Sequence, residues 1–67
     1  MSKLINGYTL EQIYAYRQDL IVEALQDAAD CKKYRYYDMA IRYEEKAENY
    51  RIVPASDIAF LMEFKGF

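Results

Sequence analysis

The sequence predicts a small all-α protein, an antiparallel helical hairpin plus a short C-terminal helix in a small three-helix arrangement. Three observations support this prediction. From Tyr8 to Val53 the chain has neither glycine nor proline, so nothing strongly interrupts a helix. Apolar residues recur there at helical spacing, but their phase changes near residue 31, which indicates a turn. Pro54 then breaks the pattern, and a dense apolar run follows it.

The first helix is expected over residues 9–29. Thr9 followed by Gln12 fits a capping box, in which each side chain bonds the other residue's backbone amide. Tyr8 before the cap and Ile13 after it are placed as a hydrophobic staple. At 100° per residue the apolar side chains then share one arc: Leu10, Ile13, Tyr14, Leu20, Ile21, Ala24, Leu25 and Ala28.

The second helix is expected over residues 32–51. Its seam alternates large and small side chains at heptad-like spacing, a pattern suited to close helix packing: Tyr36, Ala40, Tyr43, Ala47 and Tyr50. A smaller apolar strip falls on nearly the opposite side: Tyr34, Tyr37 and Ile41. Extending the first stripe reaches Arg35 instead of Tyr36, so a turn near residues 29–33 is favoured over one continuous rod.

Charge supports the hairpin. Residues 9–30 carry one basic and five acidic side chains, whereas residues 31–51 carry six basic and four acidic ones. Antiparallel packing would bring these complementary helices together.

The C-terminal segment is expected to form a third helix. Pro54 suits its first turn, Ser56 or Asp57 can cap it, and Gly66 can end it. Its apolar residues divide into two faces: Ile58, Leu61 and Met62 on one, and Phe60 and Phe64 on the other. A strand pairing with residues 3–5 is the alternative for a run this apolar. In the helical case Phe60, Phe64 and Phe67 are expected in an interface, since exposed phenylalanines are unfavourable in a monomer.

Length and composition limit the function classes. Sixty-seven residues predict one small helical domain, residues 1–67. One cysteine, Cys31, cannot form an internal disulfide, and the absence of histidine removes the commonest transition-metal ligand. The sequence shows neither a phosphate-binding loop nor a nucleophile paired with a base, so we expect no enzyme, no cofactor and no metal. The polar N-terminus and the lack of a long apolar run predict a cytoplasmic protein without a membrane span.

Arg17 interrupts the apolar arc of the first helix. A buried arginine needs a carboxylate or carbonyl partner, because an unpaired buried charge is costly. The structural interpretation is an internal ion pair with an acidic residue of the second helix, or an aliphatic stem lying over tyrosines. The functional interpretation is an arginine on a binding face.

Basic and aromatic residues alternate in the segment from Lys32 to Tyr37. This pattern suits an acidic protein surface, and it can also stack nucleobases while following phosphates. The net charge of −2 makes nucleic acid the weaker alternative, since non-specific binding depends on counterion release. The residues expected to bind a partner are Arg17, Lys32, Lys33, Tyr34, Arg35, Tyr37, Ile41, Phe60, Phe64 and Phe67.

The sequence therefore predicts a non-enzymatic protein-binding module, an inhibitor or modulator of a larger protein or complex. Its eight tyrosines supply aromatic surface beyond what a hairpin core can bury. In size, acidity and tyrosine content the chain resembles the small inhibitors that phages and mobile elements direct against host machinery. The alternative is a structural helical module that satisfies this surface by homo-oligomerisation.

Tyr37, Ala40 and Ala47, followed by Pro54, resemble the second helix of a tetratricopeptide repeat. The match covers a single copy, and such units need neighbouring repeats to bury their cores.

Overall fold

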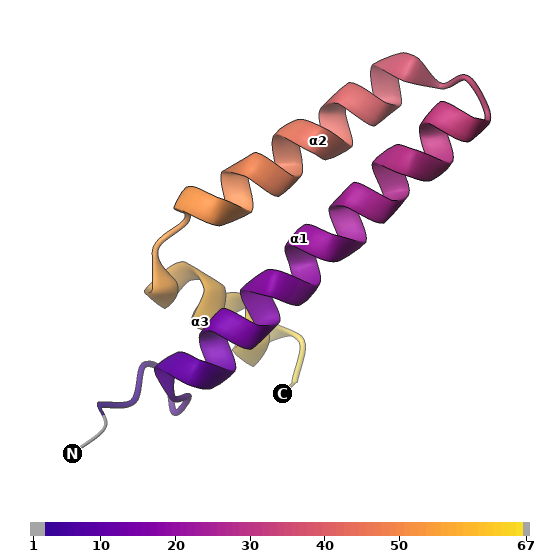
Figure 1. Cartoon of the computed structure of the whole chain (residues 1–67). Helices are drawn as coiled ribbons and strands as arrows, with labels where there is room; N and C mark the ends of the chain where they lie inside the picture. The colour runs from indigo at the N-terminus through magenta and orange to yellow at the C-terminus, as the bar shows by residue number, and fades with distance from the viewer. Residues whose placement is uncertain (1–2, 67) are drawn as a thin grey trace.

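The computed structural model describes residues 3–66, which form three α-helices. Helix α1 spans Leu10–Lys33, α2 spans Tyr37–Ile52 and α3 spans Ala55–Phe64. Figure 1 shows α1 and α2 as a long antiparallel hairpin, with α3 packed beside the first half of α1. The predicted all-α hairpin with a third helix is confirmed. The strand alternative for the C-terminal segment is wrong.

A short hook precedes α1. Ile5 and Tyr8 exchange two backbone hydrogen bonds of 2.9 and 3.0 Å, closing a turn with Asn6 at φ 53° and Gly7 at φ 86°. An Asn-Gly pair with both residues in the left-handed region is the favoured composition of a type I′ turn. Ile5 therefore pairs within its own hook and not with the C-terminal segment.

The predicted capping box starts α1. The Thr9 hydroxyl accepts a bond from the Gln12 amide at 3.2 Å, and the Gln12 side-chain oxygen accepts one from the Thr9 amide at 2.8 Å. Tyr8 packs against the buried cluster that contains Ile13, where the predicted staple places it.

Helix α1 continues about one turn beyond its predicted end, and the expected turn at residues 29–33 is wrong. The amide of Tyr36 donates to the Cys31 carbonyl at 2.7 Å, and the amide of Arg35 donates to the Lys32 carbonyl at 3.1 Å. These two bonds form a Schellman motif, which ends a helix with one left-handed residue. That residue is Arg35, at φ 64°.

The predicted seam of α2 is confirmed from Ala40 onward. Ala40 and Ala47 are each 1 % exposed, while Tyr43 and Tyr50 are half-buried. Tyr36 was predicted to begin this seam, but it precedes the helix and is exposed. The prediction fails there because the helix starts five residues later than expected.

Two buried clusters hold the helices together. Ile21 and Ala24 of α1 meet Ala47 of α2, with Tyr50 beside them. The second cluster joins the start of α1 to α3: Ile13, Ile58, Ala59 and Met62. Among residues 3–66, five of the nine buried residues are alanines, so the hairpin buries little apolar area for its length.

Helix α3 presents the two faces expected of it. Ile58 and Met62 are buried with Leu61 partly buried, whereas Phe60 and Phe64 point outward. The predicted cap at Ser56 or Asp57 is wrong: Pro54 occupies the cap position, and within the described residues no side chain caps this end.

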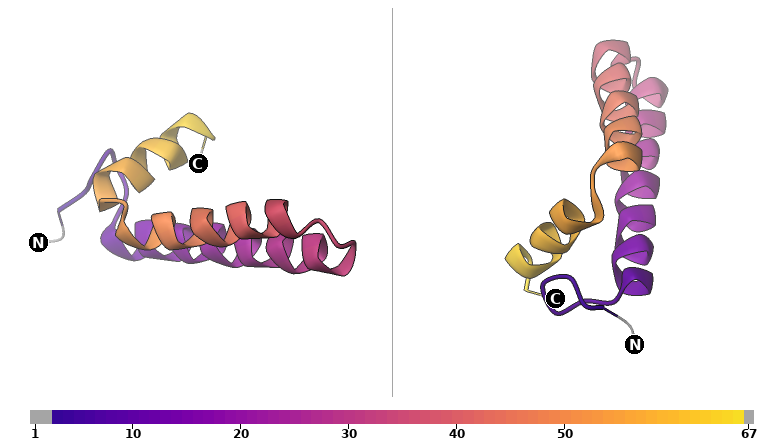
Figure 2. Two further views of the ribbon diagram at one scale, coloured as in Figure 1. Left: turned by 90° about the horizontal axis from the view of Figure 1, so that it is seen from above. Right: turned by 90° about the vertical axis from the view of Figure 1, so that its left-hand side faces the viewer.

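Beyond α3, Gly66 adopts φ 83° and ends the helix as predicted. Figure 2 shows α3 to one side of the hairpin, with the opposite side uncovered.

Candidate functional site

The residues expected to bind a partner fall at two separate ends of the molecule. The molecule is elongated, with a longest extent of 48 Å. Residues 32–37 form the hairpin tip, while Phe60 and Phe64 lie on α3 at the other end (Figure 1). The two groups therefore form two distinct surfaces. Phe67 lies outside the described residues.

The hairpin tip, defined as residues 32–37, consists of the last two residues of α1, the turn and the first residue of α2. All six side chains are exposed. Its three tyrosines are all well exposed: Tyr34 at 65 %, Tyr36 at 59 % and Tyr37 at 59 %. Sequence reasoning left Tyr36 out of the binding set because it assigned that residue to the core.

The basic residues of the tip are held differently from one another. Lys32 bonds Glu44 across the hairpin, Nζ to Oε2, at 3.2 Å. The Lys33 ammonium lies 5.9 Å from the ring centroid of Tyr34, within cation–π range. Arg35 stands at the apex of the turn with an exposed side chain. The tip thus presents positive charge and aromatic rings together.

Ile41 lies one turn beyond Tyr37 on the same exposed side of α2 and is itself exposed. It extends the apolar surface of the hairpin tip along the helix. The predicted strip of Tyr34, Tyr37 and Ile41 is therefore exposed, although Tyr34 belongs to the turn and not to α2.

Phe60 and Phe64 form a second apolar surface on the outside of α3, and the two residues are 61 % and 81 % exposed. They are four residues apart on one helix, so they share a face. The exposure agrees with the expectation that these rings are free to meet a partner.

Arg17 has a structural position between the helices. Its guanidinium donates to the backbone carbonyls of Arg51 at 3.3 Å and Val53 at 2.6 Å, and it lies 5.7 Å from the ring centroid of Tyr14. The carbonyl end of a helix carries partial negative charge, so a cation stabilises it. Arg17 thus ties α1 to the end of α2 through carbonyls, where the sequence favoured an acidic partner.

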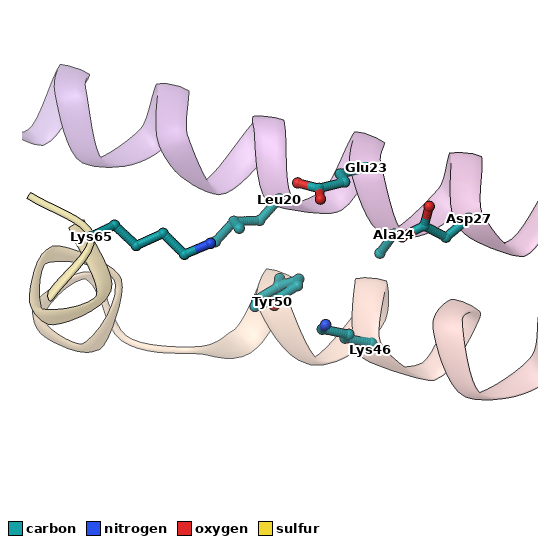
Figure 3. A pocket seen from close by; sticks show the side chains of 7 residues that line it. All are labelled: Leu20, Glu23, Ala24, Asp27, Lys46, Tyr50 and Lys65. Atoms are coloured by element: carbon teal, nitrogen blue, oxygen red, sulfur yellow. The ribbon is translucent and has the colours of Figure 1, made fainter. Parts of the chain in front are cut away.

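The cavities offer little to a small ligand. Figure 3 shows one of about 90 Å³ between α1 and α2, where the side chains of Glu23, Asp27, Lys46 and Lys65 converge. Ligand sites usually measure about 300–1,000 Å³ and are mostly apolar, so this small cavity with two acids and two lysines is a poor match. Among residues 3–66 no cluster of histidine, cysteine, aspartate or glutamate is placed to hold a metal ion.

A larger hollow of about 370 Å³ lies beside α3, and its lining is mostly apolar and aromatic: Tyr8, Gln12, Ala15, Tyr16, Asp19 and Met62. Its volume is in the range of ligand sites, but its polar groups are limited to one carboxylate, one amide and the side chains of two tyrosines.

Within the described part of the chain, none of the helices is long and apolar enough to cross a membrane. No protein-family model, curated protein or solved structure matches the chain.

Proposed function

We propose that this protein is a non-enzymatic binding module that inhibits or modulates a larger protein, and that it docks an acidic surface through its hairpin tip. The observation that carries the proposal is the conformation of Arg35. A left-handed residue at a helix end is usually glycine, because a Cβ there is unfavourable by about 1–2 kcal/mol. This chain has arginine at that position.

Strain of this kind is often associated with functional sites, where the side chain is needed in a place the backbone does not favour. At Arg35 the turn exposes an arginine side chain between the exposed Tyr34 and Tyr36 of the chain. Glycine would end the helix at lower cost but would remove the guanidinium.

The chemistry of the hairpin tip suits a protein partner. Tyrosine and arginine are enriched among the residues that dominate binding energy at protein interfaces. The rings supply contact area at low entropic cost, and the positive charges of Lys33 and Arg35 steer the tip toward negative potential. A partner with exposed aspartates and glutamates fits these properties.

Photocrosslinking tests this proposal. A photoreactive phenylalanine analogue replaces Tyr36 at the tip or, as a control, Gln26, an exposed residue of α1 away from the tip. In lysate of the source cells, the tip position is expected to capture a discrete protein with acidic surface character, and the control position is not. Equal capture from both positions would refute the proposal.

The variant Arg35→Gly separates binding from folding. It keeps the turn and removes the guanidinium, so it is expected to fold at least as well as the parent while capture falls. Nucleic acid is the competing ligand for the same cluster, and fluorescence anisotropy with a labelled single-stranded oligonucleotide measures it directly. Salt-sensitive oligonucleotide binding that is lost in Arg35→Gly, with no protein captured, would favour that alternative.

A further inference from the structure

A second exposed surface runs along α1 and shares only Lys32 with the hairpin tip. At 100° per residue, seven side chains of α1 fall within an arc of about 80°. All seven are exposed, and together they define the outer stripe of α1: Glu11, Tyr14, Gln18, Val22, Leu25, Ala29 and Lys32.

The outer stripe lies on the side of the hairpin away from α3. The Lys32–Glu44 ion pair shows that this flank of α1 borders the flank of α2 that carries Glu44. The opposite flank carries Leu20 and Glu23, which line the cavity that Lys65 reaches from beyond α3. Figure 2 shows α3 on one side of the hairpin only, so the stripe faces the uncovered side.

The outer stripe is complementary to a second copy of itself that runs in the opposite direction. When two copies of α1 lie antiparallel about a two-fold axis near Val22, Glu11 of one copy falls opposite Lys32 of the other. Opposite charges then meet at both ends of the seam, which favours this orientation. A parallel arrangement would set the basic tips of the two hairpins side by side, which opposes it.

The same register pairs large side chains with small ones. Tyr14 falls opposite Ala29, and Gln18 falls opposite Leu25, so each large residue meets a smaller or flexible one as interdigitating helices require. Val22 lies close to the axis and meets its own copy. The residues of the outer stripe thus complement the same residues taken in reverse order. Binding to a different protein would not require this property, so it indicates that the partner is a second copy of the chain.

We infer that the protein forms an antiparallel homodimer through the outer stripe of α1, with the two hairpins making a four-helix arrangement. The stripe from Glu11 to Lys32 is about 32 Å long at 1.5 Å per residue. The stripe is about 10 Å wide, and the adjoining flank of α2 adds a second strip of about the same width along its 16 residues, about 24 Å. Each copy then contributes on the order of 560 Å², and the total of about 1,100 Å² is near the lower limit for a specific interface.

The composition of the core supports the same inference. Alanines make up most of the buried set, while Tyr14, Val22 and Leu25 remain exposed on one flank. Domains of this size often rely on an added constraint such as an oligomer interface, because one small core supplies little stability. Burial of the outer stripe provides that constraint.

Sedimentation velocity across a micromolar concentration series tests the dimer. The parent chain is expected to sediment as a species of twice its 8.0 kDa mass. Val22→Glu places two carboxylates together at the axis and is expected to raise the dissociation constant by roughly 100-fold. Asn49→Glu adds the same charge at an exposed position of α2, on the side opposite the buried Ala40 and Ala47, and is expected to leave the dimer intact. A monomeric parent, or a dimer that survives Val22→Glu, would overturn the inference.

A cysteine crosslink tests the register without relying on a disruptive variant. In a Cys31→Ser background, Val22→Cys is expected to give a disulfide-linked dimer under mild oxidation, because the two copies of this position meet at the axis. Gln26→Cys is the matched control and is expected to stay monomeric under denaturing conditions. Crosslinking at Gln26→Cys in preference to Val22→Cys would show that the two helices meet in a different register and would overturn the proposed one.

Discussion

Replacement of Arg35 by glycine is expected to stabilise the protein. The left-handed conformation of a residue with a Cβ is unfavourable by about 1–2 kcal/mol. Glycine removes that cost but makes the unfolded chain more flexible, which destabilises by about 0.4–1 kcal/mol. Relative to alanine at the same position, the net gain in the free energy of unfolding is therefore about 0.5–1 kcal/mol. For a domain of this size, that raises the melting midpoint by roughly 3–6 °C.

Circular dichroism melts and urea titrations of the parent chain, Arg35→Gly and Arg35→Ala measure this effect. Arg35→Ala is the matched control, because it loses the same cation at the carbonyl end of α1 but keeps the backbone strain. The difference in the free energy of unfolding between the glycine and alanine variants isolates the contribution of the left-handed backbone conformation. If the glycine variant is no more stable than the alanine variant, Arg35 is not left-handed in solution and the reasoning from this turn is wrong.

Three further substitutions test the packing. Ala47→Leu is expected to overpack the hairpin seam and lower the free energy of unfolding by about 1–3 kcal/mol, measured by urea titration; an unchanged midpoint would place Ala47 outside the core. Arg17→Met removes two charge-assisted hydrogen bonds to backbone carbonyls and is expected to lower the free energy of unfolding by about 1–3 kcal/mol. If the variant instead loses partner capture at unchanged stability, Arg17 belongs to a binding surface. The double change Phe60→Ser and Phe64→Ser is expected to leave the melting midpoint nearly unchanged and to weaken any association that uses α3; unfolding or aggregation would show that these rings are buried.

Local signals in the sequence were sufficient for much of the fold. The capping box at Thr9, the alternation around Ala47 and the faces of α3 each depend on residues a few positions apart, and all were predicted correctly. The turn was placed too early because Tyr36 was counted in the seam of the second helix, whereas it precedes that helix. The true helix end carried no sequence signal, because Arg35 takes the left-handed position that glycine usually occupies.

That displaced turn also explains the partner of Arg17. A hairpin turning near residue 31 would place Arg17 beside Glu45, where an ion pair is reasonable. The turn lies near residue 35, so Arg17 lies beside Arg51 and Val53 and bonds their carbonyls. Long-range register depends on the turn position, which is why the sequence indicated that Arg17 needs a partner but not which one. The binding role of the hairpin tip and of the α3 rings remains a prediction.

The two buried clusters differ in how far apart their members lie along the chain, and this determines the order in which they can form. Ile21 and Ala47 are about 26 residues apart. The contacts between α1 and α2 can form one after another from the turn outward, so each new contact costs little additional loop entropy. Ile13 and Ile58 are about 45 residues apart, so we expect α3 to dock after the hairpin has formed. The same asymmetry makes α3 the segment that detaches most readily from the native state. Its amide hydrogens should exchange with solvent sooner than those at the centre of α1, through opening events that leave the hairpin folded.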